Sequence, residues 1–292
     1  MQASNRLRAA FAQGRQSMGM WQMIPGANVS RLLARSGADW VMVDCEHGNI
    51  DGASTSQADK TEADIQLAVD GAMHDAVPAI AALGVSPIVR IPDVQSWMVK
   101  RALDAGAHGL TVSAKILVPL LRSAEQAREL VQAAKFPPLG KRGFGSPIAP
   151  ERFSPMPSFT EYLLQANDTL LTMVQIETRE ALEQVEDIAA VDGIDVLFIG
   201  PFDLGNNIGH PILNGVMAAE LKEAMARILE ACRNAGKKCG VYASDGEQAK
   251  GYAGQGYDMI SVSTDYTALD YISKQQLSIS LGGSSPEKGG SY

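Results

Sequence analysis

The chain has 292 residues, of which 46% are hydrophobic and 20% are charged, as is typical of a globular protein with one large core. Its formal net charge of −8 argues against nucleic acid and anionic membranes as partners. No run of about 18 apolar residues predicts a membrane-spanning helix. The three cysteines, Cys45, Cys232 and Cys239, form neither a disulfide framework nor a C-x-x-C motif, which indicates a reducing compartment.

The N-terminal segment carries several arginines and no acidic residue before Asp39. In this respect it resembles a mitochondrial presequence. The plainer interpretation is an amphipathic first helix, because Leu7, Ala10 and Phe11 fall on one helical face. We therefore expect a cytoplasmic protein, with a mitochondrial location as the alternative.

Short apolar runs alternate with helical segments along the chain, in the near-continuous pattern of buried parallel strands. The predicted strands are 18–23, 39–44, 87–91, an interrupted one within 110–121, 170–176, 195–199, 238–242 and 259–262. The predicted helices are 30–36, 72–82, 95–105, 124–134, 179–190, 217–235, 247–253 and 267–274. Eight such units predict a single-domain (β/α)8 TIM barrel over residues 1–281. An open doubly wound sheet is the alternative, but no G-x-G-x-x-G follows an early strand.

The predicted strands end in chemically capable residues, where a parallel barrel forms its active site. The second strand ends at Asp44, with His47 just beyond it, and the third ends around Arg90. The fifth strand runs through Gln175 to Glu177, and the sixth runs into the segment 200–203. This placement predicts one site that is built from several strand ends.

Glu177 and Asp203 end consecutive predicted strands. Neighbouring strands lie about 4.8 Å apart, so the two carboxylates can converge on one cation. Two carboxylate oxygens completed by water and substrate suit Mg²⁺ or Mn²⁺. The alternative is two unrelated acids placed at helix starts, where the helix dipole favours them.

His47 can act as a general base near neutral pH, with Asp44 orienting its ring. Its alternative role is a structural loop histidine. Arg90 can stabilise a developing enolate oxygen in the barrel mouth, or it can form an internal ion pair with Asp44 or Asp203. Gly200 can bring the backbone close to a ligand, whose carboxylate would then meet helix-start amides.

With these residues assembled, the chain resembles the HpcH/HpaI aldolases, within the phosphoenolpyruvate/pyruvate-binding barrel superfamily. The resemblance spans roughly residues 18 to 265. The matching segments are Gly19-Met20-Trp21, 39–48, Val89-Arg90-Ile91-Pro92, 102–107, 136–143, 175–179 and 198–204.

The resemblance implies a metal-dependent mechanism. Glu177 and Asp203 would hold a divalent ion, Mg²⁺, Mn²⁺ or Co²⁺, which would chelate pyruvate or oxaloacetate. Arg90 would stabilise the enolate, and His47, oriented by Asp44, would move the proton.

The resemblance also assigns supporting roles. Trp21 and Gln175 would line the substrate pocket, together with Gly200 and Phe202, and Asp104 would support the histidine region. Family members assemble as homo-hexamers whose neighbouring subunits help to complete the sites.

The implied function is that of a class II aldolase, a carbon–carbon lyase that joins a 2-oxo acid to an aldehyde, or separates them, through a metal-bound pyruvate enolate. An oxaloacetate decarboxylase or a macrophomate-synthase-like enzyme would use the same enolate. An alternative of another class is a barrel without turnover that serves as a binding or assembly protein.

The sequence departs from the family pattern in two inserts and in one motif. The inserts fall near 52–71, expected as a loop extension, and near 111–116, inside the fourth strand. The stretch from Asn206 to His210 also differs from the family, which leaves the second substrate open. The Gly/Ser-rich tail 282–292 is expected to be disordered.

Overall fold

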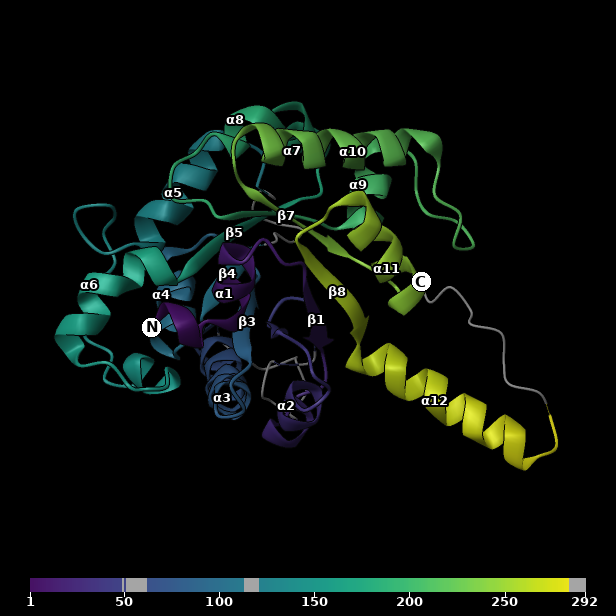
Figure 1. The fold of residues 1–292 in the computed structure, drawn as a ribbon, viewed down its shortest axis with the longest axis horizontal. Coiled ribbons are helices and arrows are strands. Elements are labelled where there is room, and N and C mark those ends of the chain that lie inside the picture. Colours follow the sequence, from purple (N-terminus) through teal and green to yellow (C-terminus); the bar gives the residue numbers. More distant parts are fainter. Residues whose placement is uncertain (49, 51–61, 113–120, 284–292) are drawn as a thin grey trace.

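The computed structural model describes residues 1–48, 50, 62–112 and 121–283. Eight parallel strands close into a barrel in the order β1 to β8, as predicted (Figure 1). The strands are β1 (Ser17–Gln22), β2 (Trp40–Asp44), β3 (Ser86–Ile91), β4 (Gly109–Val112), β5 (Leu171–Ile176), β6 (Val196–Ile199), β7 (Lys238–Tyr242) and β8 (Met259–Thr264).

Helices surround the barrel, and most of them connect consecutive strands. The α-helices are α1 (Arg6–Ala12), α2 (Ala27–Ala34), α3 (Glu62–Ala81), α4 (Ser96–Asp104), α5 (Ala124–Ala134), α6 (Phe159–Thr169), α7 (Arg179–Glu183), α8 (Val185–Ala189), α9 (Pro201–Ile208), α10 (Ala219–Asn234), α11 (Gly246–Gln255) and α12 (Asp265–Ser280). The 3-10 helices are η1 (Gln2–Ser4) and η3 (Ala149–Arg152).

The barrel is filled by a separate inner cluster of apolar side chains. Trp40 and Phe198 are its largest rings and are fully buried. Gly19 and Gly240 make room for them, because an added Cβ would lie 2.1 Å from the Trp40 ring and 2.3 Å from the Phe198 ring. Glycine on the neighbouring strand therefore allows a large ring to fill the barrel. The second and larger cluster lies between the strands and the helices around them.

The predicted first helix is present as α1, and it closes the end of the barrel where the strands begin. Leu7 joins the inner cluster and is fully buried. The Asn5 amide donates to the carbonyls of His108 and Thr169, both at 2.9 Å. Arg8 pairs with Asp195 at 2.9 Å. Through such ion pairs, N-terminal arginines connect the α1 region to residues at the strand starts.

The structure corrects several predicted boundaries. Helix α3 begins at Glu62, so residues 62–71, predicted as loop, are helical. The predicted helix 179–190 is split into α7 and α8 at Gln184. Strand β4 keeps its register with β3 and β5 through Val112, so the start of the predicted insert 111–116 is ordinary strand. Residues 51–61 and 113–120 lie outside the described part of the chain, as does the tail beyond Gly283.

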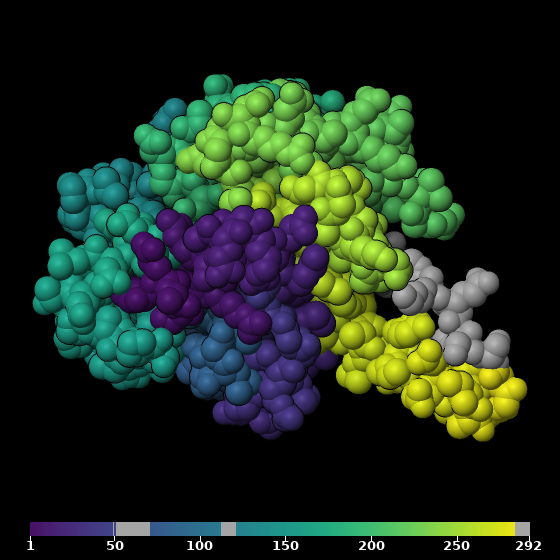
Figure 2. All heavy atoms as spheres, viewed as in Figure 1, coloured from purple at the N-terminus to yellow at the C-terminus, as the bar shows by residue number. Residues whose placement is uncertain are grey.

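Helix α12 extends away from the barrel (Figures 1 and 2). Asp265 is the buried residue of this helix. Leu269, Ile272, Leu277 and Ile279 are all exposed along it. In the described part of the chain, no helix combines the length and apolar character needed to cross a bilayer.

Asp39, just before β2, binds several groups at the end of the barrel where the strands begin. Its carboxylate accepts hydrogen bonds from Arg6 at 3.0 Å, from Arg15 at 2.7 and 3.0 Å, and from the Met18 amide at 3.2 Å. Burial by itself raises the pKa of Asp39. The Arg15 hydrogen bonds and charge, the Met18 amide and Arg6 outweigh this effect and lower the pKa below its ordinary value.

We expect Asp39→Asn to lower the free energy of unfolding at pH 7 by about 1–2 kcal/mol, because charged hydrogen bonds to half-exposed arginines are lost. A lowered folded-state pKa stabilises the protein above the unfolded pKa, near 3.9, and this stabilisation is lost as pH falls through the folded pKa. The difference between variant and wild type should therefore shrink below about pH 4. Urea unfolding at pH 7 and pH 3 measures it, and an equal difference at both would contradict the assignment.

Candidate active site

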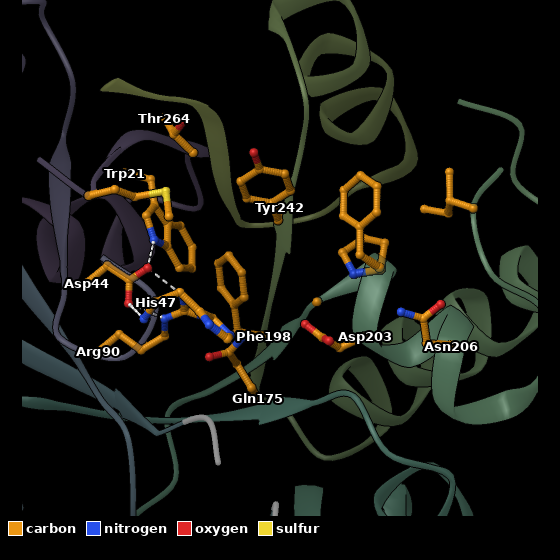
Figure 3. Close-up of a pocket in the computed structure, with 15 residues that line it drawn as sticks. Trp21, Asp44, His47, Arg90, Gln175, Phe198, Asp203, Asn206, Tyr242 and Thr264 are labelled. Atoms are coloured by element: carbon orange, nitrogen blue, oxygen red, sulfur yellow. Dashed lines mark hydrogen bonds and ion pairs between the residues drawn. The ribbon is translucent and has the colours of Figure 1, made fainter. Parts of the chain in front are cut away.

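A cavity of about 610 Å³ opens at the carboxyl ends of the strands (Figure 3). Its described lining comes from seven strands or the residues that follow them, and includes the predicted site residues except Glu177 and Asp104. The lining residues are Trp21, Met23, Asp44, His47, Arg90, Gln175, Phe198, Gly200, Pro201, Phe202, Asp203, Asn206, Ile212, Tyr242 and Thr264. Its size is within the usual range for small-molecule sites.

Arg90 and Asp44 form a buried ion pair in the lining of this cavity. The two residues lie directly opposite each other in the β2–β3 register. Arg90 Nε donates to Asp44 Oδ1 at 2.9 Å, and Nη2 donates to Oδ2. The Arg90 guanidinium carbon also lies 4.7 Å from the centre of the Trp21 ring, a cation–π distance. This pairing is one of the two alternatives that the sequence left open for Arg90.

Three further donors complete the hydrogen bonding of Asp44. Trp21 Nε1 donates to Oδ2 at 3.0 Å, and the backbone amides of Glu46 and His47 donate to Oδ1 at 3.0 Å each. Burial raises the pKa of Asp44, but the charge and hydrogen bonds of Arg90, then Trp21 and the His47 amide, outweigh it and lower the pKa. Asp44 is therefore ionised, and the backbone amide of His47 donates to it.

Glu46 adds a second carboxylate to the same arginine. Its Oε2 lies 3.1 Å from Arg90 Nη1, and its Oε1 lies 3.6 Å from His47 Nε2. Glu46 is almost fully buried, whereas 37% of the His47 side chain is exposed at the cavity rim. Glu46 was not among the site residues predicted from the sequence, although its place beyond a strand end was the available signal.

Burial lowers the pKa of Arg90, but three carboxylates reverse the effect. Asp44 contributes most, followed by Glu46 and Glu177, and together they raise the pKa above its ordinary value. Arg90 thus stays charged and interacts electrostatically with carboxylates at both the β2 end and the β5 end of the site.

Gln175 and Glu177 are adjacent at the end of β5. Gln175 Nε2 donates to Glu177 Oε2 at 3.2 Å. Gln175 Oε1 is buried and has no hydrogen-bond partner among the described residues. A Cβ at Gly200 would lie 2.9 Å from Glu177 Oε2, so glycine keeps the space beside this carboxylate open.

Helix α9 brings Phe202, Asp203 and Asn206 to the cavity. Asp203 is exposed in the first turn of the helix, with Gly200 as its N-cap. In the described ranges no group of three His, Cys, Asp or Glu residues is clustered to hold a metal. The donors that fit a hard cation are the two predicted carboxylates and the unpartnered Gln175 oxygen. That is an oxygen set that water and substrate would have to complete.

Asp104 lies elsewhere. It ends α4, and its carboxylate accepts from Arg142 Nη2 at 3.0 Å. A helix that follows a barrel strand runs back toward the strand starts, so its last residue lies far from the strand ends. The described contacts of Asp104 therefore do not support the predicted role beside His47.

The geometry of this site agrees with the family resemblance, and the sequence profile of the HpcH/HpaI aldolase/citrate lyase family matches residues 17–270. The chain belongs to this family. It is similar to the hydroxypyruvate/pyruvate aldolase of Roseovarius nubinhibens, with 34% identity over 94% of this chain and 96% of that relative.

Two other family comparisons are informative. The 4-hydroxy-2-oxo-heptane-1,7-dioate aldolase of Klebsiella pneumoniae is 34% identical, over 91% of this chain and 90% of that relative. The solved structure of macrophomate synthase matches with a TM-score of 0.78 and 26% identity, over 96% of this chain and 89% of that chain. The predicted HpcH/HpaI membership and the relation to macrophomate synthase are confirmed.

We expect Arg90→Met to lower the free energy of unfolding by about 3–5 kcal/mol, because Asp44 and Glu46 would stay buried without their cation. Arg122→Met is the matched control. Arg122 is about half exposed and lies 3.9 Å from Glu180, so its loss should cost less than about 1 kcal/mol. Chemical denaturation measures both variants, and equal losses would show that the buried pair contributes no more than a surface pair.

Proposed function

We propose that this chain is a divalent-metal-dependent carbon–carbon lyase that cleaves or forms 4-hydroxy-2-oxo acids, with a pyruvate-like acid and an aldehyde as the two parts. The supporting observation is that Arg90, Gln175 and Asp203 line one cavity, with Glu177 hydrogen-bonded to Gln175. The names of the relatives from Roseovarius nubinhibens and Klebsiella pneumoniae, both aldolases, agree with it.

Glu177 and Asp203 are the proposed metal ligands, with Gln175 Oε1 as a further oxygen donor. The buried, unpartnered Gln175 oxygen and the open space at Gly200 fit a cation at this place. Mg²⁺, Mn²⁺ or Co²⁺ would supply Lewis-acid stabilisation of enolate charge when bound. The geometry favours a hard, oxygen-preferring ion over a thiolate-bound one, since all the donors are oxygens.

Arg90 is the proposed electrostatic stabiliser of the enolate. Its Nε, Nη1 and Nη2 face Asp44 and Glu46, but each Nη carries two N–H bonds. One N–H on each Nη can therefore donate to the 2-oxo oxygen of a bound acid. Asp44 and Trp21 hold the guanidinium plane, so the donors are oriented before substrate arrives.

His47 is the proposed proton carrier. Its imidazole lies at the cavity rim, where it can reach a substrate carbon or oxygen through water. Asp44 fixes the loop through the His47 amide, while Glu46 faces the ring at 3.6 Å. We assign the substrate carboxylate to the start of α9, where first-turn amides have no acceptor within the helix. Pro201 has no N–H, so the donors would be the Phe202 and Asp203 amides.

The same groups would serve the loss of CO₂ from oxaloacetate, which yields the same enolate. The family resemblance supports this second candidate, because it implies a pyruvate enolate for both reactions. The two reactions differ in the bond that breaks, so they separate when each substrate is supplied alone.

We expect purified protein with Mg²⁺, Mn²⁺ or Co²⁺ to exchange the methyl protons of pyruvate in D₂O, and EDTA to abolish the exchange. Glu177→Gln and Asp203→Asn should each lower the exchange rate at least about 100-fold, because the enolate charge loses its counter-charge. Proton NMR measures exchange without any aldehyde. Exchange that survives both EDTA and the variants would rule out the metal site, and no exchange by folded protein would favour a binding or assembly role.

We also propose that the chain forms a homo-oligomer, a hexamer as the family resemblance implies. Helix α12 supports this, because Leu269 and Ile272 are exposed on a helix that leaves the barrel (Figure 2). A reducing compartment such as the cytoplasm is proposed as well, and three buried free cysteines support it.

Replacing Leu269 and Ile272 together by glutamate should reduce the oligomer to smaller species, because the apolar contact would then have to bury charge. Size-exclusion chromatography with light scattering gives the mass. Gln276→Glu adds a charge to the same exposed helix without removing an apolar side chain, and it should leave the mass unchanged. A monomeric wild type would exclude the assembly.

A further inference from the structure

The two sides of the cavity differ in chemistry (Figure 3). One side holds the ionic cluster around Arg90 and Asp44. Apart from Asp203 on α9, the described residues that line the other side are uncharged, and they come from α9, the segment after it and the β1, β7 and β8 ends. They are Met23, Phe202, Asn206, Ile212, Tyr242 and Thr264. The proposed function accounts for the ionic side, and the uncharged side remains to be assigned.

Aromatic rings form a continuous wall along this second side. The Trp21 and Tyr242 ring centres are 5.8 Å apart at an interplanar angle of 85°. Tyr242 and Phe202 follow at 6.2 Å and 67°. These are edge-to-face arrangements, which fix the rings against one another. We call Trp21, Tyr242 and Phe202 the aromatic wall.

Two rings of the aromatic wall, Tyr242 and Phe202, are open to the cavity. Trp21 is 4% exposed and is committed to Asp44 and Arg90, whereas Phe202 and Tyr242 are only half-buried. Figure 3 shows Tyr242 between Trp21 and the Asn206 side of the cavity. A ligand bound at Arg90 would therefore have Tyr242 and Phe202 beside its far end.

The wall is where the second substrate must lie. Under the proposed function, the 2-oxo oxygen of the donor meets Arg90 and its carboxylate meets the start of α9, which carries Phe202. The acceptor carbonyl carbon must reach the donor methylene from the remaining side, and its substituent then extends along the wall. A flat ring there would pack against two accessible rings, and Ile212 adds apolar surface.

We propose that the acceptor is an aldehyde with an aromatic substituent, held by Phe202 and Tyr242. This inference rests on the proposed function. The new bond forms between the methyl-derived carbon of the pyruvate enolate and the aldehyde carbon. One methyl proton leaves through His47, and one proton returns to the aldehyde oxygen. The product is a 4-aryl-4-hydroxy-2-oxobutanoate, and no oxidant or further reactant is needed.

The test compares three acceptors with pyruvate and Mg²⁺ or Mn²⁺: benzaldehyde, succinic semialdehyde and acetaldehyde. For wild type we expect kcat/KM for benzaldehyde to exceed that for succinic semialdehyde by at least about tenfold, since the described residues on this side offer ring contacts and no cation. Equal values, or a preference for the anionic aldehyde, overturn the inference.

Variants locate the preference. Tyr242→Leu, and separately Phe202→Leu, should each lower the benzaldehyde-to-acetaldehyde ratio of kcat/KM by about tenfold. Phe159→Leu, at an exposed phenylalanine of α6, is the matched control and should not change the ratio. An unchanged ratio in both wall variants also overturns the inference, and if one variant does not fold, the other decides.

Pyruvate exchange distinguishes a failure of this inference about the acceptor from a failure of the proposed lyase function. Metal-dependent exchange without an aromatic preference rejects the acceptor and leaves the lyase assignment in place. Absence of exchange by the wild type rejects both.

Discussion

The pairing of Arg90 with Asp44 is the interaction on which the mouth of the barrel depends. The strand register places the two residues opposite each other, at the point where β2 and β3 end. A buried ion pair repays its loss of water only when its remaining hydrogen-bonding groups are also satisfied. Here Trp21, two backbone amides and Glu46 meet that condition. The loop that carries His47 and the indole of Trp21 are therefore fixed by the same charges.

A second group of ion pairs lies at the opposite end of the barrel, where the strands begin. Between the two groups lies the inner apolar cluster, with Trp40 and Phe198 as its largest rings. At the strand starts, Asp39 and Asp195 bind the arginines of the first segment. The charged groups at each end of the barrel thus pair with one another, and a close-packed apolar layer separates the two ends.

Much of the barrel was predictable from the sequence because its strands are buried on both faces and therefore appear as apolar runs. Strand β7 matches its prediction at both ends, and β3 differs by one residue. A helix start was expected beside Gly200, but no predicted helix range covered α9, since Gly205, Asn206 and Asn207 are poor helix formers. The burial of Leu204 stabilises this helix, and a local hydrogen bond from the His210 amide to the Gly205 carbonyl closes its C-terminus.

Which residues would gather at the site was also predictable, since a polar group after a buried strand faces the barrel mouth. Their partners were not. That Asp44 meets Arg90, and that Glu46 faces His47, depends on register and on loop conformation. Tyr242 carried no chemical signal in the sequence, because an aromatic residue at a strand end more often belongs to a core. The role of Asp104 stays a prediction, because its motif is local, whereas its position depends on the direction of α4, at whose end it pairs with Arg142.

The projecting helix α12 shares its root with the cavity. Asp265, its first residue, accepts hydrogen bonds at 2.9 Å from the amides of Met23 and Ile24, and Thr264 directly precedes it. Met23 and Thr264 both line the cavity beside the aromatic wall. A neighbouring molecule that packed against α12 would therefore contact a helix that begins at the rim of the pocket. A change in assembly through α12 would then reach the site on the side of the aromatic wall, away from the buried pair of Arg90 and Asp44.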